Sequence, residues 1–357
     1  MKKIFCVFFS LLILCGCTTL KENSEITERE RIIGVWISCY ELNSMLSSGD
    51  FKNQFNEVSE NLSEFGATDA FVHVRAFGDS LFSSDFYPQN ETAKQYDFDV
   101  LEFMIKTLKK KNIRFHAWIN PFRRADGTFN NPADTATVSA VLGGIREIID
   151  KYSVSGVHFD DYFYPADSTE IDADTYSAYL TATENPLTLE EYRLSVINSF
   201  VLLAKDAIDT KSKDIIFSIS PAADIEKNKT SAFADVEYWC KTGVIDYIIP
   251  QLYFGYDYPD KNFRFSYLLS RWQSIERADN TKLLIGLAAY KTGTEQQPDK
   301  EEWQSDTVLS RQTADCIKSD NISGICCFSY TYLFAQDELH TSVLENVKEQ
   351  LTAASIK

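Results

Sequence analysis

The segment VSGVHFDDYFYP, residues 154–165, joins an apolar, strand-like run to two adjacent carboxylates and a loop that ends in proline. Active sites of parallel α/β barrels are built at the carboxyl ends of the strands. Asp160 and Asp161 end the run, so a barrel would carry both side chains at its catalytic face. Aspartate is also an ordinary turn residue, and the segment alone leaves that alternative open.

Seven further apolar, β-branched runs have the spacing of repeated strand–helix units. They cover residues 32–38, 70–75, 114–120, 215–220, 247–253, 283–289 and 322–329, with the run that contains the two carboxylates at 156–161. Helical patterns are expected at 51–65, 100–111, 138–152, 189–210, 236–242, 265–277, 307–318 and 339–354. Eight strands close a parallel barrel, so the sequence predicts an α/β fold, a single-domain (β/α)8 TIM barrel over residues 31–357.

The N-terminus has the pattern of an export signal. Two lysines precede an apolar stretch, residues 4–14, which is too short to span a bilayer. The Leu-Cys-Gly-Cys sequence that ends at Cys17 resembles a bacterial lipobox, which implies a signal peptide of residues 1–16 and lipid on Cys17. Residues 17–30 would be a polar tether, and the membrane a partner through the lipid. Thr18 favours the outer membrane or cell surface; an ordinary secretory signal is the alternative.

Charge and cysteine content limit the possible partners and cofactors. The net charge of −17 argues against a nucleic-acid partner. Five cysteines lie outside the predicted signal, most of them in apolar runs, and no spacing fits a zinc site. They are Cys39, Cys240, Cys316, Cys326 and Cys327. We expect buried free thiols, with one or two disulfide bridges left open, and neither a metal nor another cofactor.

Polar and aromatic side chains recur late in the predicted strands. The two-residue period of a strand puts His73 with Arg75 on one face and Gln251 with Tyr253 on another. If those faces line the barrel, the side chains converge at its carboxyl end, although each could instead be a hydrogen-bonded core group. The predicted substrate-binding residues are Trp36, His73, Arg75, His116, Trp118, Asn120, Arg123, Tyr162, Tyr164, Gln251 and Tyr253.

Seven segments resemble the glycosyl-hydrolase-like family ten, in chain order over about residues 31–330: RIIGVWIS, FVHVRAFGDSLFSSDFYP, FHAWINPFR, GVHFDDYFYP, FSISPAA, VIDYIIPQLYF and LLIGLAAY. The resemblance implies a barrel glycoside hydrolase, often exported as a lipoprotein, that acts on a polysaccharide. For a cell-envelope lipoprotein it implies peptide-free peptidoglycan strands as the substrate. The sequence departs from the expected glycine- and aromatic-containing pattern at residues 222–224 (AAD).

Asp160 and Asp161 are the predicted catalytic residues. Their Cα atoms lie about 3.8 Å apart and their side chains start on opposite faces, which does not suit two carboxyls about 5–5.5 Å apart across a sugar ring. A substrate-assisted route fits better, in which Asp160 orients the 2-acetamido group of the sugar and Asp161 donates the proton. Alternative partner carboxylates are Asp79, Asp224 and Asp257, whereas Asp246 is discounted because it begins a strand.

Two other functions remain open. The first is a metal-dependent hydrolase, because His73, His116, His158 and Asp160 all fall on predicted strands of a barrel. Against it, no strand carries His-x-His and no helix carries HExxH. The second is a surface lipoprotein that binds a glycan without cutting it, since a barrel fold does not by itself imply catalysis.

Overall fold

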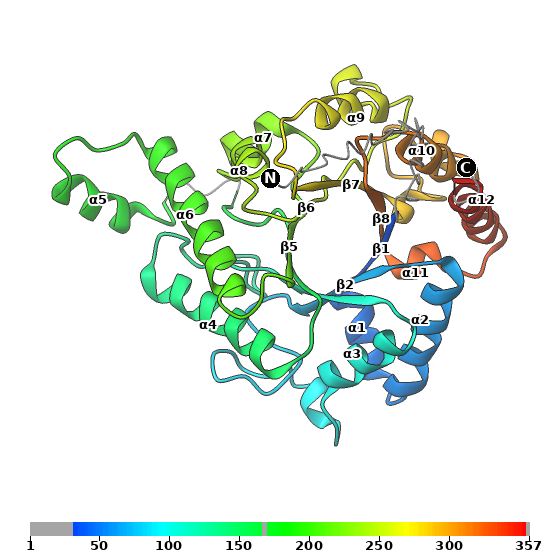
Figure 1. Cartoon of the computed structure of the whole chain (residues 1–357), viewed down its shortest axis with the longest axis horizontal. Helices are drawn as coiled ribbons and strands as arrows, with labels where there is room; N and C mark the ends of the chain where they lie inside the picture. The colour runs from blue at the N-terminus through cyan, green and yellow to red at the C-terminus, as the bar shows by residue number, and fades with distance from the viewer. Residues whose placement is uncertain (1–30, 166–169, 355–357) are drawn as a thin grey trace, which may run out of the picture. The chain divides into compact units, whose positions relative to one another are not determined.

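The computed structural model describes residues 31–165 and 170–354, which form a closed barrel of eight parallel strands ringed by helices (Figure 1). The predicted signal peptide, the tether and the lipidation site at Cys17 lie outside the described residues. Within the described ranges, no helix combines the length and apolarity needed to cross a bilayer. The predicted TIM barrel is confirmed.

Strands and helices alternate through most of the chain. The strands are β1 (Ile32–Ile37), β2 (Asp69–Arg75), β3 (Arg114–Ile119), β4 (Gly156–Phe159), β5 (Ile216–Ile219), β6 (Tyr247–Ile248), β7 (Lys282–Leu287) and β8 (Gly324–Phe328). The α-helices are α1 (Cys39–Ser47), α2 (Phe51–Phe65), α3 (Val100–Lys110), α4 (Thr135–Lys151), α5 (Ala173–Ala182), α6 (Leu189–Asp209), α7 (Ile225–Ser231), α8 (Val236–Thr242), α9 (Phe265–Gln273), α10 (Val308–Ile317), α11 (Tyr330–Leu333) and α12 (Glu338–Ala354). Short 3₁₀ turns are η1 (Ala93–Gln95), η2 (Lys261–Phe263), η3 (Ala289–Lys291) and η4 (Glu302–Gln304).

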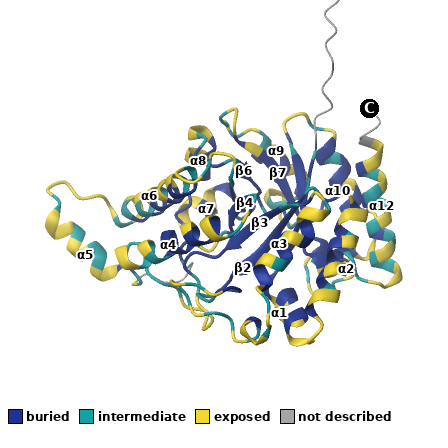
Figure 2. Ribbon diagram, turned by 60° about the horizontal axis from the view of Figure 1, so that its bottom comes forward, coloured by how far each residue is buried: buried dark blue, intermediate teal, exposed yellow. Residues whose placement is uncertain are grey.

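Each strand pairs in parallel with its neighbours in the sequence, and β1 closes the barrel against β8. The alternation of side chains along the strands creates two apolar layers. In β1, Val35 packs in the cluster shared with the helices, whereas Trp36 joins Phe71 and Trp118 in a separate cluster inside the barrel. Figure 2 shows the strands buried and the outer helix faces exposed. The inward face predicted from the two-residue period is therefore real for β1 and β3.

Strand ends differ from the predicted ones throughout the barrel, and two of these differences bear on the site. The run 247–253 contributes only Tyr247–Ile248 to regular pairing, because Pro250 has no backbone N–H to donate to the ladder. The fourth strand stops at Phe159, so Asp160 and Asp161 lie at the start of the following loop. That position frees both side chains from strict strand alternation.

Several short helices were not predicted, namely α1, α5, α7 and α11. Helix α1 begins directly after β1, where Ser38 accepts from Glu41 N and Glu41 Oε2 accepts from Ser38 N. This reciprocal capping box is written in the sequence as Ser-x-x-Glu. Glu41 also accepts from Ser329 Oγ and Thr331 N, so it ties the ends of β1 and β8 together.

A buried ionic cluster closes the amino-terminal end of β2 and β3. Asp69 accepts from Arg114 at 2.9 and 2.7 Å and lies 2.6 Å from His116 Nε2. Burial alone would raise the pKa of Asp69, but His116 and then Arg114 outweigh it and lower that pKa to about 2. The carboxylate is therefore charged in the fold and depends on its two partners.

We expect Asp69→Asn to lower the free energy of unfolding by about 3 kcal/mol, because it removes the buried carboxylate that binds both the buried His116 and the partly exposed Arg114. Urea denaturation measures the change, with the exposed Asp97→Asn as the control. Equal stability of the two variants would show that this cluster does not hold the barrel's amino end.

Candidate active site

The two adjacent aspartates lie at the carboxyl end of the barrel and face different strands. Asp160 is 3% exposed, and its Oδ2 accepts from Trp118 Nε1 at 3.1 Å and from Asn120 Nδ2 at 3.4 Å. Asp161 is partly exposed, and its Oδ1 accepts from Gln251 Nε2 at 3.3 Å. One carboxylate is thus fixed by β3 and its loop, and the other by the segment after β6.

Both carboxyls are hard to ionise in this environment. Burial and, second, the adjacent Asp161 raise the pKa of Asp160 to about 8, while Trp118, the Tyr162 N–H and Arg123 oppose the rise. Burial also raises the pKa of Asp161, against its own backbone N–H, Gln251 and Arg123. Because like charges this close disfavour each other's ionisation, the pair retains a proton near neutral pH. An acid and a carboxylate are then available side by side.

Gln251 and Tyr253 lie on the β6 side of the site. Gln251 Nε2 also donates to Ser220 O at 3.0 Å, which fixes the amide against β5. Tyr253 is partly exposed between the rings of Tyr290 and Phe328, with centroids 5.7 and 5.9 Å away. Burial raises the pKa of Tyr253 well above its ordinary value, so its hydroxyl remains a hydrogen-bond donor.

His73 stacks on the indole that binds Asp160. Its ring lies 3.8 Å from that of Trp118 at an interplanar angle of 7°, and both ring nitrogens are buried without a hydrogen-bond partner. Burial, Arg123 and Arg75 lower the pKa of His73 to about 3. The imidazole is therefore neutral and supports Trp118 from one face.

Arg75 does not share the inward face of His73, contrary to the prediction. A register shift falls between His73 and Arg75, and Arg75 pairs with the outward-facing Ile119. An irregularity of this kind reverses the side-chain alternation, which a period of two cannot reveal. The guanidinium stacks 3.9 Å from the Tyr87 ring and donates to the backbone carbonyl of Asn120 at 2.5 Å. It braces the loop after β3 from the helix side.

Two other predicted binding residues are core groups. His116 is fully buried on Asp69 at the amino-terminal end of the barrel. Trp36 is 1% exposed, and its Nε1 donates to the buried His158 at 3.0 Å. Both face inward as predicted, but they lie in deeper layers of side chains than the carboxylates. Alternation fixes the face of a strand and not the depth along it.

Tyr164 is also buried, and its hydroxyl donates to Asp172 at 3.2 Å. Asp172 is in turn held by Arg193 at 2.8 and 2.6 Å. This buried pair anchors the loop after β4, and Tyr164 still contributes to the wall of a cavity described next. Its aromatic face is not open in the manner of a sugar-stacking ring.

A hairpin in the loop after β3 contributes to two cavities. Arg123 and Phe129 pair across the hairpin, and Arg124 N donates to Thr128 O at 2.8 Å. The larger cavity, of about 890 Å³, is lined by Asp161 together with Gly127, Thr128, Phe129, Tyr162, Tyr164, Pro165, Glu170, Ile171, Ala222, Lys227, Asn228, Ser231 and Ala232. The departure from the family pattern at Ala222 thus forms part of its wall.

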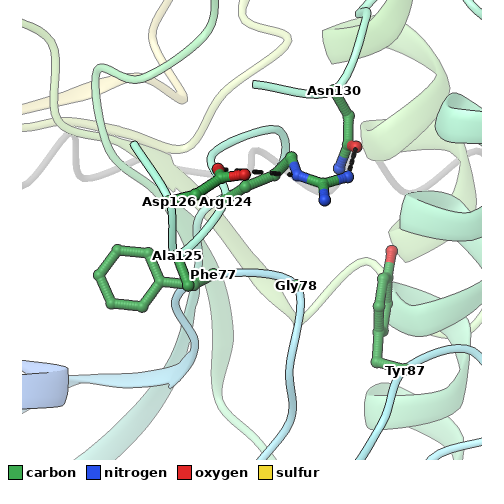
Figure 3. A pocket seen from close by; sticks show the side chains of 7 residues that line it. All are labelled: Phe77, Gly78, Tyr87, Arg124, Ala125, Asp126 and Asn130. Carbon is green, nitrogen blue, oxygen red and sulfur yellow. Dashed lines mark hydrogen bonds and ion pairs between the residues drawn. The ribbon is translucent and has the colours of Figure 1, made fainter. Parts of the chain in front are cut away.

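The smaller cavity, of about 420 Å³, is formed by residues of the same hairpin and of the loop after β2 (Figure 3). Its lining residues are Phe77, Gly78, Tyr87, Arg124, Ala125, Asp126 and Asn130. Arg124 Nη1 donates to Asn130 Oδ1 at 3.3 Å, and its Nε lies 3.8 Å from Asp126 Oδ1. The hairpin therefore contributes to the walls of both cavities, and Asp161 lines the larger one.

Four aromatic rings and Arg123 form a row of contacts beside the two cavities. The Arg123 guanidinium lies 4.4 Å from the Tyr162 ring and 5.4 Å from the Phe77 ring. Tyr40 and Phe129 extend the row at either end, with centroid distances of 6.4 Å. Sequence reasoning selected Arg123 and Tyr162 as binding residues but not the other three, because Tyr40 lies in the first turn of α1 and Phe77 and Phe129 lie in loops, so no periodic pattern relates them.

The alternative carboxylates have other surroundings. Asp224 caps α7 by accepting from Lys227 N, and Asp79 accepts from Asn90 Nδ2 at 3.0 Å. Asp246 pairs with Lys205 at the start of β6, and Asp257 is exposed. Among the described residues, no group of three or more His, Cys, Asp or Glu side chains could hold a metal ion. The five cysteines of the barrel are buried and free, as predicted.

Comparison with known families identifies related proteins. Residues 31–142 and 125–305 match the family described as Glycosyl hydrolase-like 10. The chain is 26% identical to glycosyl hydrolase YngK of Bacillus subtilis over 75% of this chain, and it spans 62% of that relative's length. It is 22% identical to glycosyl hydrolase DigH of Escherichia coli K12, over 92% of this chain and 91% of the relative. The resemblance noted from the sequence is confirmed.

A solved structure with the same fold is the GH18 chitinase of Cycas revoluta in complex with (GlcNAc)4. It superposes with a TM-score of 0.57 at 10% identity, over 90% of this chain and 99% of the chitinase. At this identity the likeness establishes a shared barrel fold.

Asp160→Asn should raise the melting temperature at alkaline pH. The pKa of about 8 in the fold exceeds the ordinary value of about 3.9, so the folded chain binds more protons than the unfolded chain between these values. Stability from this group is complete below about pH 4 and is lost as the pH rises through about 8. The uncharged variant escapes that loss.

Scanning calorimetry at about pH 5 and about pH 8.5 measures the effect, with the exposed Asp257→Asn as the matched control. The gain should be larger at the higher pH, by roughly 2–4 °C for each kcal/mol recovered. A gain that does not grow with pH would contradict the raised pKa.

Proposed function

Because the chain belongs to the glycosyl hydrolase-like 10 family, we propose that its barrel is a glycoside hydrolase that uses Asp160 and Asp161 as its catalytic pair. The observation that carries this proposal is the unequal exposure of two adjacent carboxyls that retain a proton. Asp160 is buried and held by two side-chain donors and one backbone donor, while Asp161 lines the larger cavity. Glycoside hydrolysis needs one protonated carboxyl and one group that stabilises or attacks the anomeric carbon.

In the proposed route the sugar supplies its own nucleophile. Asp160 orients the 2-acetamido group, whose carbonyl oxygen bonds to the anomeric carbon as the bond from that carbon to the leaving oxygen breaks. Asp161 delivers the proton that the pair shares to the leaving oxygen, because Asp161 is the member of the pair that lines the cavity. A water then adds to the anomeric carbon, its proton returns to Asp161 and the acetamide re-forms. Two displacements retain the anomeric configuration.

Neighbouring side chains have roles that suit this route. Trp118 and Asn120 hold Asp160 in one orientation, and Gln251 does the same for Asp161. Tyr253 keeps its hydroxyl proton and can donate to the acetamido oxygen. Tyr162 is 39% exposed, and its ring can contact the apolar face of a sugar.

We further propose peptide-free peptidoglycan strands as the substrate. Their sugars carry the 2-acetamido group that the mechanism requires, and the related chitinase structure contains (GlcNAc)4, an oligosaccharide with the same substituent. The relatives named above are called glycosyl hydrolases, and the chain spans 62% of the Bacillus subtilis relative's length. The predicted signal and lipid on Cys17 would keep the barrel at the cell envelope, near such strands.

The lipid anchor is a separate proposal with its own test. Full-length protein should partition into the detergent phase of a cloud-point separation, and Cys17→Ser should move it to the aqueous phase, because acylation needs the thiol. Equal partitioning of the two proteins would contradict lipidation at this residue.

Hydrolysis is tested by incubating the chain without residues 1–17 with peptide-free peptidoglycan strands and measuring shortened glycans by mass spectrometry. Asp160→Asn and Asp161→Asn should each lower the rate by about 10²–10⁴-fold, because each removes a group used in the bond-breaking step. The control is Asp257→Asn, which removes an exposed carboxylate of the segment after β6.

Full activity in both variants would refute the assignment of the pair. Loss of activity in Asp257→Asn alone would transfer the role to that carboxylate. Binding of intact strands with no product from the parent protein would indicate a glycan-binding protein without hydrolase activity.

Removing the acetyl group from the substrate tests the source of the nucleophile. De-N-acetylated strands should be cleaved at least about a hundredfold more slowly, because the free amine has no carbonyl oxygen to attack the anomeric carbon. NMR of the first product should show retained configuration. Inverted product, or equal cleavage of both glycans, would contradict the substrate-assisted route.

A further inference from the structure

Arg123 has an unusual position for a charged side chain. It lies on the hairpin after β3, partly buried, with its guanidinium 4.4 Å from the Tyr162 ring and 5.4 Å from the Phe77 ring. Its own backbone N–H donates to Asn120 Oδ1 at 3.1 Å, which fixes the start of the hairpin. Two aromatic faces and a tethered backbone therefore restrict the orientation of this side chain before any ligand binds.

The hydrogen-bonding edge of Arg123 is unused. Its guanidinium makes no hydrogen bond or ion pair with any residue of 31–165 or 170–354. Its neighbours in the fold behave differently: Arg75 donates to backbone carbonyls, and Arg124 binds Asn130 and Asp126. A guanidinium carries five N–H donors in a planar fork that matches a carboxylate in two-point geometry.

The residues around Arg123 indicate where a ligand carboxylate could bind. Tyr162 lines the cavity that contains Asp161, and Phe77 lines the smaller cavity. Arg123 lines neither cavity itself, but its guanidinium contacts one ring of each, so a chain of sugars that occupied both cavities would come close to it. The charge of Arg123 lowers the pKa of Asp160 and of Asp161, but Arg123 makes no hydrogen bond or ion pair with either carboxyl group.

We propose that Arg123 is a specificity-determining residue that binds a carboxylate substituent of the glycan, so that this site selects an acidic 2-acetamido polysaccharide over a neutral one. The inference rests on the proposed glycan-hydrolase function and goes beyond it by naming a charged group that the substrate must carry. Peptide-free peptidoglycan has such a group, because its muramic acid residues bear a lactyl carboxylate. A chitin chain has the same 2-acetamido sugars without the acid.

Fixed orientation and stacking distinguish arginine from lysine here. A lysine would supply the charge at one point, without the planar fork and without the same stacking between two rings. An arginine that served only to lower the pKa of the two aspartates would act alike on acidic and neutral glycans. The chemistry of the substituent therefore separates the two roles.

The test is calorimetric binding of two oligosaccharides prepared from peptide-free peptidoglycan strands, one with free carboxyls and one with each carboxyl converted to its methylamide. All proteins lack residues 1–17 and carry Asp161→Asn, so that the ligand stays intact. The arms are this parent, Arg123→Gln, Arg123→Lys and Arg146→Gln, the last a charge-matched change on the exposed face of α4.

The parent should bind the free acid about tenfold or more tightly than the methylamide, as expected for hydrogen bonds to a charged group. Arg123→Gln should lose this preference while binding the methylamide as the parent does, Arg123→Lys should keep part of it, and Arg146→Gln should keep all of it. A preference that survives Arg123→Gln, or equal loss for both ligands, would overturn the inference.

The outcome is separable from that of the hydrolase assay. Charge-selective binding that depends on Arg123, with no cleavage by the protein that retains Asp161, would refute hydrolysis and leave the inference standing. Cleavage without charge selectivity would do the reverse. Absence of binding to both oligosaccharides would overturn the inference together with the assignment of the glycan.

Discussion

The site depends on the cost of placing two charged carboxylates side by side in a poorly solvated barrel mouth. Asp160 and Asp161 follow β4 directly, so chain connectivity forces them together. Burial resists ionisation of both, and the adjacent Asp161 adds to that resistance at Asp160. The hydrogen bonds from Trp118 to Asp160 and from Gln251 to Asp161 offset only part of it. The pair therefore keeps a proton that an ordinary aspartate would have lost, and an acid is available at neutral pH.

The two ends of the barrel divide stability and chemistry between them. At the amino-terminal end, Asp69 is fully paired with Arg114 and His116, and its pKa is lowered. At the carboxyl end, Asp160 is short of counter-charges and its pKa is raised. An ionised aspartate is thus stabilised at the amino-terminal end and destabilised at the carboxyl end. This pattern is expected when the active site lies at one end of a barrel and the stabilising interactions lie at the other.

Sequence periodicity was sufficient for the barrel and for the inward face of most strands, because each strand buries one face inside and one against helices. It failed where the backbone departs from regular alternation. The register shift before Arg75 turns that side chain outward, and Pro250 interrupts the regular pairing of β6. Periodicity also does not show how far along the barrel axis a side chain lies. Trp36 and His116 were therefore predicted to be in the site, although they lie in deeper side-chain layers of the barrel. The contacts around Arg123 come from separate loops, and no pattern in the chain relates them.

The most direct test of this account is the pH dependence of reducing-end release from peptide-free peptidoglycan strands by the chain without residues 1–17. If the carboxyl pair supplies the acid, activity should fall as the pH rises through about 8, where the pair loses its proton. Activity that continues undiminished well above that pH, or the absence of release at any pH, would contradict the central claim.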